Sequence, residues 1–260
     1  MRSFALLLTV AACGYVALCA FYYFAQDALL FQGAAPVAPD APALDVRFDV
    51  PGTWLAGYIV NPDAPVDVVY FGGNAEPVAA NAGRFAAITR ARTLLVDYRG
   101  YGRSPGTPSQ AAWVDDATRY VREFRAGRRG QLLLVGHSLG TGVAALAAAR
   151  LAPEVDALVL VSPFSSLTRV ARAQLPWLPV AYLLRHPFDV ASVVDTLPRR
   201  VTVVIATDDR VIAPDESRRF VGLLPTRPTV VELEGAGHNG ALARDATWQA
   251  IAAVVDALEE

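Results

Sequence analysis

The sequence predicts an α/β protein built on a mostly parallel sheet of eight strands flanked by helices. Apolar, strand-like runs alternate with helical patterns over most of the chain. The later runs are continuously apolar rather than alternating, which is typical of parallel strands covered by helices on both faces. The expected strands lie at residues 46–50, 55–60, 66–71, 93–96, 131–135, 157–161, 200–206 and 229–233.

The spacing of apolar residues predicts helices in segments between and after these strands. Two helices combine an apolar face with a charged or polar face, as expected for helices that pack on a sheet. They are residues 111–124, with Val114, Ala117, Val121 and Phe124 on the apolar face, and the last helix, with Trp248, Ile251, Val255 and Leu258. Ligands of such sheets bind at the carboxyl ends of the strands, so that edge is where we look for a site.

The 260-residue chain divides into three parts by composition. Residues 1–26 are expected to form a membrane anchor and residues 27–44 a Pro- and Ala-rich linker. Residues 45–260 are long enough for one α/β domain with a sizeable core. Within that domain, residues 163–199 interrupt the alternation of strands and helices, and we expect this apolar insertion to form a small helical cap over the site.

The anchor is predicted from residues 4–24, which contain no charged residue. About 20 apolar residues suffice to cross a bilayer as a helix. Arg2 precedes the run, Asp27 follows it, and the next basic residue is Arg47. Because positive charge favours the cytoplasmic side, we expect a single-pass protein whose domain lies outside the cytoplasm.

Two alternatives to an uncleaved anchor stay open, a cleaved signal peptide and a lipoprotein. The run ends without a clear small-residue cleavage site, and the segment before Cys13 is a poor lipobox. Both cysteines, Cys13 and Cys19, fall in this segment, so the domain has no disulfide and no thiol nucleophile. No Cys/His cluster suggests a metal, and we expect no cofactor.

The pentapeptide Gly136-His137-Ser138-Leu139-Gly140 lies between a predicted strand and an Ala-rich helix. A serine between glycines at such a turn is typical of a nucleophile elbow, in which tight backbone forces the hydroxyl out above the sheet. Ser138 is therefore the expected nucleophile. The first backbone N–H of its oxyanion hole is expected from Leu139, the residue after the nucleophile.

A serine nucleophile needs a general base, usually imidazole. Of the three histidines, His137 neighbours Ser138 on the elbow and is expected to point elsewhere, and His186 lies in the cap segment. His238 lies in a glycine-rich loop after the last strand, where it can reach the elbow, and is the expected base. Its orienting carboxylate is expected after the strand 200–206.

Two adjacent aspartates follow that strand, of which Asp209 is favoured and Asp208 is the alternative. The second oxyanion donor is expected in the loop after the strand 66–71, where Gly72-Gly73-Asn74 allows close backbone approach. Asn74 is the candidate for that donor.

Taken together with the segment 97–106, Asp-Tyr-Arg-Gly-Tyr-Gly-Arg-Ser-Pro-Gly, these motifs follow the order of a known superfamily. Over residues 45–258 the chain resembles the α/β hydrolases, and most of all the small-cap, membrane-anchored serine hydrolases related to protein depalmitoylases. The resemblance implies the α/β-hydrolase fold, a triad of Ser138, Asp209 and His238, and an oxyanion hole formed by Leu139 and Asn74. One departure is Gly72, where many relatives have His.

The expected activity is therefore hydrolysis of a carboxylic ester or thioester through an acyl-enzyme. An aminopeptidase- or amidase-like reaction on the same fold, or a non-catalytic membrane-tethered binding protein, stays open. The apolar cap favours a small-molecule or lipid-like acyl substrate. A net charge of −2 without a basic run argues against nucleic acid as a partner, and no feature predicts an oligomeric state.

Overall fold

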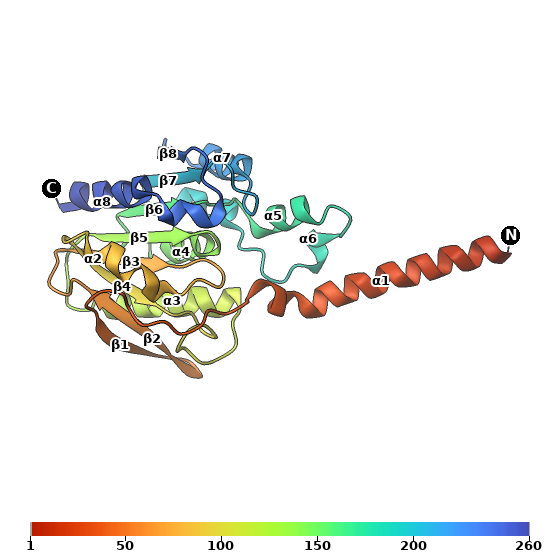
Figure 1. Cartoon of the computed structure of the whole chain (residues 1–260), viewed down its shortest axis with the longest axis horizontal. Coiled ribbons are helices and arrows are strands. Elements are labelled where there is room, and N and C mark those ends of the chain that lie inside the picture. Colours follow the sequence, from red (N-terminus) through yellow and green to blue (C-terminus); the bar gives the residue numbers. More distant parts are fainter. Residues whose placement is uncertain (1, 260) are drawn as a thin grey trace.

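The computed structural model of the chain describes residues 2–259 and contains one eight-stranded sheet with helices on both faces (Figure 1). Its strand order is β1-β2-β4-β3-β5-β6-β7-β8, and only the pairings of β2 with β1 and β4 are antiparallel. The predicted mostly parallel sheet is thus confirmed. The strands are β1 Leu44–Val50, β2 Thr53–Val60, β3 Val66–Phe71, β4 Ala91–Val96, β5 Leu132–His137, β6 Ala157–Val161, β7 Arg200–Ala206 and β8 Thr229–Leu233.

Helices α3 and α4 cover one face of the sheet, and α2 and α8 cover the other. The α-helices are α1 Arg2–Leu30, α2 Ala82–Ala86, α3 Gln110–Phe124, α4 Leu139–Leu151, α5 Leu167–Gln174, α6 Val180–Leu183, α7 Pro214–Leu223 and α8 Asp245–Glu259. Three 3₁₀ helices complete the set: η1 Val78–Asn81, η2 Val190–Thr196 and η3 His238–Ala243.

The central strands are buried on both sides, which explains their uninterrupted apolar sequence. Successive side chains of a strand point to opposite faces. Along β5, Leu132 and Leu134 therefore pack with α3 and α4, whereas Leu133 and Val135 pack with α2 and α8. This two-sided packing holds the carboxyl ends of the strands at one edge of the sheet.

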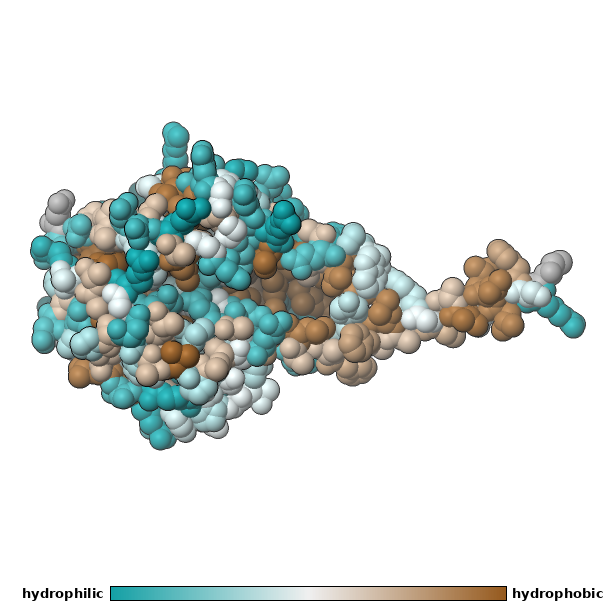
Figure 2. Space-filling model, viewed as in Figure 1, coloured by the Kyte–Doolittle hydropathy of each residue, from teal (hydrophilic) through white to brown (hydrophobic). Residues whose placement is uncertain are grey.

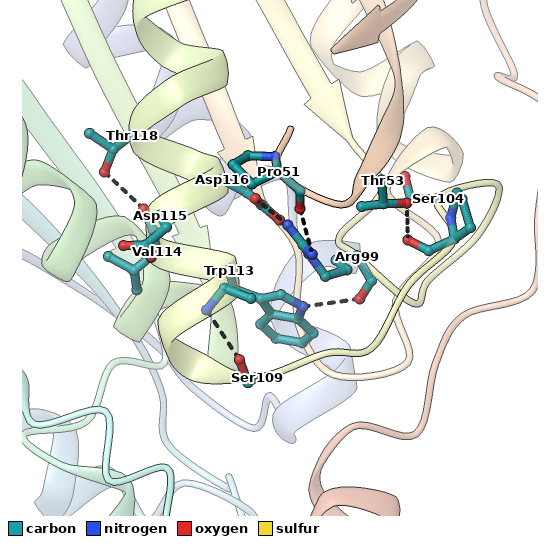
Figure 3. A network of polar contacts seen from close by, with 12 residues as sticks. Pro51, Thr53, Arg99, Ser104, Ser109, Trp113, Val114, Asp115, Asp116 and Thr118 are labelled. Carbon is teal, nitrogen blue, oxygen red and sulfur yellow. Dashed lines mark hydrogen bonds and ion pairs between the residues drawn. The ribbon is translucent and has the colours of Figure 1, made fainter. Parts of the chain in front are cut away.

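The loop after β4 is held by a buried ion pair (Figure 3). Arg99 Nε and Nη2 bond the two carboxylate oxygens of Asp116 on α3 at 2.9 and 2.7 Å. Arg99 also donates to the Pro51 carbonyl, and the Trp113 indole donates to the Arg99 carbonyl. Because the pair is bidentate and shielded, it ties the β4–α3 loop to the helix rather than taking part in chemistry.

Helix α1 projects away from the domain, and its base packs beside α6, which with α5 forms the protruding part of the cap (Figure 1). The helix runs to Leu30, four residues beyond the expected end of the anchor. Phe31 directly after it is buried in the core and contacts the Trp113 and His186 rings edge-on. Phe31, directly after α1, thus belongs to the core of the folded domain.

Substituting Asp116→Asn is expected to lower the free energy of unfolding by about 2 kcal/mol, because it removes the charge-assisted hydrogen bonds between the buried Asp116 and the partly buried Arg99. The matched control is Asp49→Asn, which breaks an exposed Arg47–Asp49 pair and should cost less than about 1 kcal/mol. Urea unfolding of the full chain in detergent measures both. Equal, small losses for the two variants would contradict a bracing role for the buried pair.

Candidate active site

The turn between β5 and α4 has the strained geometry of a nucleophile elbow. Ser138 adopts φ 51° and ψ −120°, a region that residues with side chains rarely occupy. A Cβ on Gly136 would approach the Gly140 carbonyl oxygen to 2.7 Å, and one on Gly140 would run into the Phe71 carbonyl oxygen. Gly136 is therefore required for α4 to begin this close to β5, and Gly140 for α4 to lie this close to the end of β3.

Ser138, His238 and Asp209 form one continuous hydrogen-bonded chain. Ser138 Oγ lies 2.8 Å from His238 Nε2, and His238 Nδ1 lies 2.7 Å from Asp209 Oδ2. The other carboxylate oxygen of Asp209 accepts the backbone N–H groups of Val211 and Ile212, each at 2.8 Å. The three side chains follow the ends of β5, β8 and β7, so the parallel sheet brings them together from distant parts of the sequence.

The structure separates the two aspartates that the sequence left as alternatives. Asp209 is buried and bonds His238, whereas Asp208 is exposed. Burial by itself would raise the pKa of Asp209, but its hydrogen bond to His238 and the two backbone N–H donors lower that pKa below its usual value of 3.8. The carboxylate therefore stays charged wherever an imidazole acts as a base, and it can stabilise an imidazolium.

Two backbone N–H groups near Ser138 are available to an oxyanion. Within residues 2–259, neither the Leu139 N–H, at the start of α4, nor the Asn74 N–H donates to a protein acceptor. The Asn74 side chain is itself fixed, because its Oδ1 accepts Tyr101 OH at 2.5 Å and Gln32 N at 3.2 Å. The loop that carries the expected second oxyanion donor is thus held by hydrogen bonds from Tyr101 and from Gln32.

Sequence reasoning missed Glu76, a largely shielded carboxylate that joins this loop to the elbow. Its Oε2 accepts the Gly73 N–H and faces His137 Nδ1, both at 2.7 Å. Its Oε1 accepts Tyr70 OH at 2.5 Å and Asn81 Nδ2 at 2.7 Å. Four partners from four places in the chain therefore meet on one carboxylate.

Burial alone would raise the pKa of Glu76, but His137 and the hydrogen bonds from its other partners bring that pKa below its usual value of 4.5. The His137 ring, on the other side of this pair, stacks over the His238 ring at a centroid distance of 5.6 Å. His137 thus faces Glu76 and the His238 ring, rather than lying apart from the site. A glutamate in a polar turn is usually solvated, which is why the sequence offered no signal for this role.

Ser138 and His238 open into a pocket that is also lined by Gln32, Asn74, Val211 and Asn239. None of its lining residues belongs to segment 163–199. The expectation that this cap covers the site is therefore corrected, because the cap leans toward α1. Between the cap and α1 lies a separate, almost wholly apolar pocket lined by Tyr22, Leu175, Leu178, Val180, Leu183 and Leu184 among others.

Residues 69–194 match a protein family described as alpha/beta hydrolase fold. The chain is also similar to the Pyrococcus furiosus esterase Pf2001, with a TM-score of 0.68 and 15% identity over 88% of this chain and 99% of that one. The sheet order, the elbow and these similarities define the class: the protein has the α/β-hydrolase fold.

Among curated proteins, the chain is 35% identical over 150 residues to the uncharacterized protein Rv2307c of Mycobacterium tuberculosis, covering 56% of this chain and 52% of that protein. It is 38% identical over 102 residues to the lysophosphatidylserine lipase ABHD12 of Mus musculus, covering 37% of this chain and 22% of the lipase. The matched region thus spans about half the length of Rv2307c and less of the lipase.

Glu76→Gln is expected to lower kcat for a short ester roughly 10- to 100-fold with little change in KM, because the neutral amide holds the oxyanion loop less firmly. The charge of Glu76 stabilises the fold above pH 4.5, and this contribution is lost as pH falls through its lowered pKa. Unfolding of the variant should therefore depend less on pH in that acid range. Full kcat in the variant would contradict the positioning role.

Asp209→Asn should lower kcat roughly 10⁴-fold, because an amide neither holds the required imidazole tautomer nor balances an imidazolium. Asp208→Asn is the matched control, one residue away but exposed, and should retain near-normal kcat. Ester hydrolysis by both variants measures the difference. A larger loss from Asp208→Asn would return the role to the alternative aspartate.

Proposed function

We propose that the protein is a membrane-anchored serine hydrolase that cleaves a carboxylic ester or thioester. The observation that carries the proposal is the hydrogen-bonded chain from Ser138 Oγ through His238 to Asp209, beside two free backbone N–H groups. This arrangement has the parts that acyl transfer needs: a nucleophile, a base, an orienting carboxylate and an oxyanion hole.

The reaction begins when Ser138 Oγ attacks the substrate carbonyl and His238 Nε2 takes the hydroxyl proton. The negative oxygen of the tetrahedral intermediate accepts the N–H groups of Leu139 and Asn74. His238 then protonates the leaving alcohol or thiol, which departs and leaves Ser138 acylated. Water, deprotonated by His238, attacks the acyl group, and the collapse of the second intermediate returns the proton to Ser138.

The pocket chemistry favours an ester or thioester over a substrate with a free amino terminus. A carboxylate that binds such an amine must have a free oxygen facing the pocket. Glu76, which lines the pocket, is already engaged by four partners, and Asp209 is engaged by His238 and two backbone N–H groups. The amidase-like alternative therefore lacks a recognition group among the lining residues.

The membrane anchor is supported by how α1 joins the domain. It is long and apolar enough to cross a bilayer. Near its end, Gln26 is buried, donating to the Leu183 carbonyl at 3.0 Å and accepting the Arg185 N–H at 2.7 Å. Cleavage after this helix would remove these cap contacts, so we favour a retained anchor over a signal peptide. Arg2 before the span favours an orientation with the domain outside the cytoplasm.

A lipid-like acyl substrate is the proposed substrate class. The apolar pocket between α1 and the cap offers a surface for a hydrocarbon chain. One relative is named a lysophosphatidylserine lipase, which is consistent with an acyl ester. The resemblance to protein depalmitoylases keeps an acyl thioester as the second form of the same substrate.

A fluorophosphonate probe should label the full chain in detergent but not its Ser138→Ala variant, because only a serine activated by a base attacks phosphorus. Ser192→Ala, in the exposed part of η2, is the control and should label normally. Persistent labelling of Ser138→Ala would contradict the assigned nucleophile. No labelling of the folded wild type would favour the binding-protein alternative.

The same preparation tests the substrate class with p-nitrophenyl esters of increasing acyl length and with a matched p-nitroanilide. We expect the ester rate to rise with acyl length, since each buried methylene adds apolar contact, and the anilide to be cleaved far more slowly. A rate that is flat or falls with length would contradict the lipid-like substrate.

A further inference from the structure

The cap touches α1 far from the point where α1 leaves the domain. The hydroxyl of Tyr15 donates to the Trp177 carbonyl at 3.0 Å, and the Tyr22 ring meets the Trp177 ring edge-on at 5.9 Å. Trp177 lies in the turn between α5 and α6, at the tip of the cap. This tip therefore lies alongside the middle of the uncharged stretch 4–24, not at its end.

The rise per residue of an α-helix gives the depth in the bilayer at which Trp177 contacts Tyr15. The 21 uncharged residues 4–24 extend about 31 Å at about 1.5 Å per residue, which matches a hydrocarbon core of about 30 Å. Tyr15 precedes Phe24 by nine residues, or about 14 Å along the axis. A tilt of about 20° shortens this depth only slightly. If α1 spans the bilayer, Trp177 lies well below the level of the headgroups.

The cap tip has the chemistry that this position requires. Residues 175–184, Leu-Pro-Trp-Leu-Pro-Val-Ala-Tyr-Leu-Leu, contain no charged side chain. Trp177 is 47% exposed and Tyr182 is 89% exposed, although both are large and mostly apolar. Hydrophobic surface also gathers where α1 meets the domain (Figure 2). Apolar and aromatic side chains of this kind, left open to solvent on one side, are typical of a membrane-contacting surface.

Several backbone groups of the tip have partners within the protein, as the hydrocarbon region demands of backbone that enters it. Pro176 and Pro179 have no N–H, and Leu178 N–H bonds the Leu175 carbonyl at 3.1 Å. The Trp177 carbonyl has the Tyr15 hydroxyl as its donor, so the helix itself satisfies a peptide group of the cap.

A polar belt follows the apolar tip at the level where α1 leaves its uncharged stretch. Asp27 pairs with Arg185 at 2.8 Å and with His186 Nε2 at 2.9 Å. These groups lie just beyond both apolar segments, on α1 and on the cap alike. Charged groups at the same height on two elements are expected at a membrane–water boundary.

We propose that the cap tip, residues 175–184, is embedded beside α1 in the leaflet next to the domain, so that the phospholipid bilayer is its partner. The proposal rests on the membrane anchoring given under the proposed function and goes beyond it, because a tethered domain could otherwise stand free in water. Gln32, which lines the Ser138 pocket, lies two residues after the end of α1. The embedded tip therefore holds the pocket at the membrane surface.

The test is depth-resolved fluorescence of the full chain in phosphatidylcholine nanodiscs. A nitrobenzoxadiazole label is placed on Tyr182→Cys in a background with Cys13→Ala and Cys19→Ala. Val230→Cys, equally labelled on β8 and 42% exposed, is the control. We expect blue-shifted emission and quenching by bromolipids for the label at 182 and neither for the label at 230. A label at 182 that is as accessible to aqueous iodide as the one at 230 would overturn the proposal.

A third label separates this proposal from the anchoring on which it rests. Native Cys13 lies on α1 and is exposed, and it can be labelled alone in a Cys19→Ala chain. Bromolipid quenching at 13 without quenching at 182 would leave the anchor and overturn the embedded tip. No quenching of the label at position 13 would overturn both the membrane anchor and the embedded tip. Fluorophosphonate labelling of Ser138 is measured separately. Failure of the anchor or of the embedded tip can therefore be distinguished from failure of the proposed hydrolase activity.

A charged substitution tests the tip independently of the labels. Tyr182→Asp removes few packing contacts because this side chain is 89% exposed, and Tyr182→Phe is the conservative control. In nanodiscs, Tyr182→Asp should lower the hydrolysis of p-nitrophenyl palmitate at least about threefold relative to p-nitrophenyl acetate, since a carboxylate is disfavoured in the leaflet. An unchanged palmitate-to-acetate ratio would contradict an embedded Tyr182.

Discussion

The rest of the site depends on one constraint, the close approach of the backbones of β5, α4 and β3 at the elbow. Gly136 and Gly140 allow the chain to turn where any side chain would meet backbone. The strain of that turn is localised on Ser138 and held by the surrounding sheet, whose strands are buried on both faces. Once the elbow is fixed, the carboxyl ends of β7 and β8 bring Asp209 and His238 to hydrogen-bonding distance.

Glu76 extends this constraint from the elbow to the oxyanion loop. One largely shielded carboxylate receives a backbone N–H from the loop, a histidine from the elbow, a tyrosine from β3 and an asparagine from η1. With four partners on one carboxylate the network is rigid, because losing any of them leaves part of that carboxylate unpaired. Asn74 is held in a similar way, because its Oδ1 accepts hydrogen bonds from the Tyr101 hydroxyl and the Gln32 N–H. Preorganised donors of this kind need little rearrangement when charge develops on a bound carbonyl.

The cap tip and α1 pack against each other, and α1 continues into the domain through Phe31 and Gln32. Phe31 is part of the core and Gln32 reaches the Asn74 side chain, so the base of the apolar helix and the oxyanion loop are in physical contact. The apolar tip of the cap segment, which was expected to cover the site, instead packs along α1. Because the base of α1 contacts the loop that lines the Ser138 pocket, the position of the pocket depends on the orientation of α1.

The sequence by itself determined the features that local chemistry dictates: the two-sided strands, the glycine-flanked serine, the histidine loop and the apolar N-terminal run. Each depends on residue type and spacing, and the fold class follows from them. Only the tertiary structure could distinguish Asp209 from Asp208, because neighbouring residues differ in burial and partner rather than in type. Only it could assign Glu76 and His137 to one network and turn the cap toward α1, because those contacts join residues far apart in the chain.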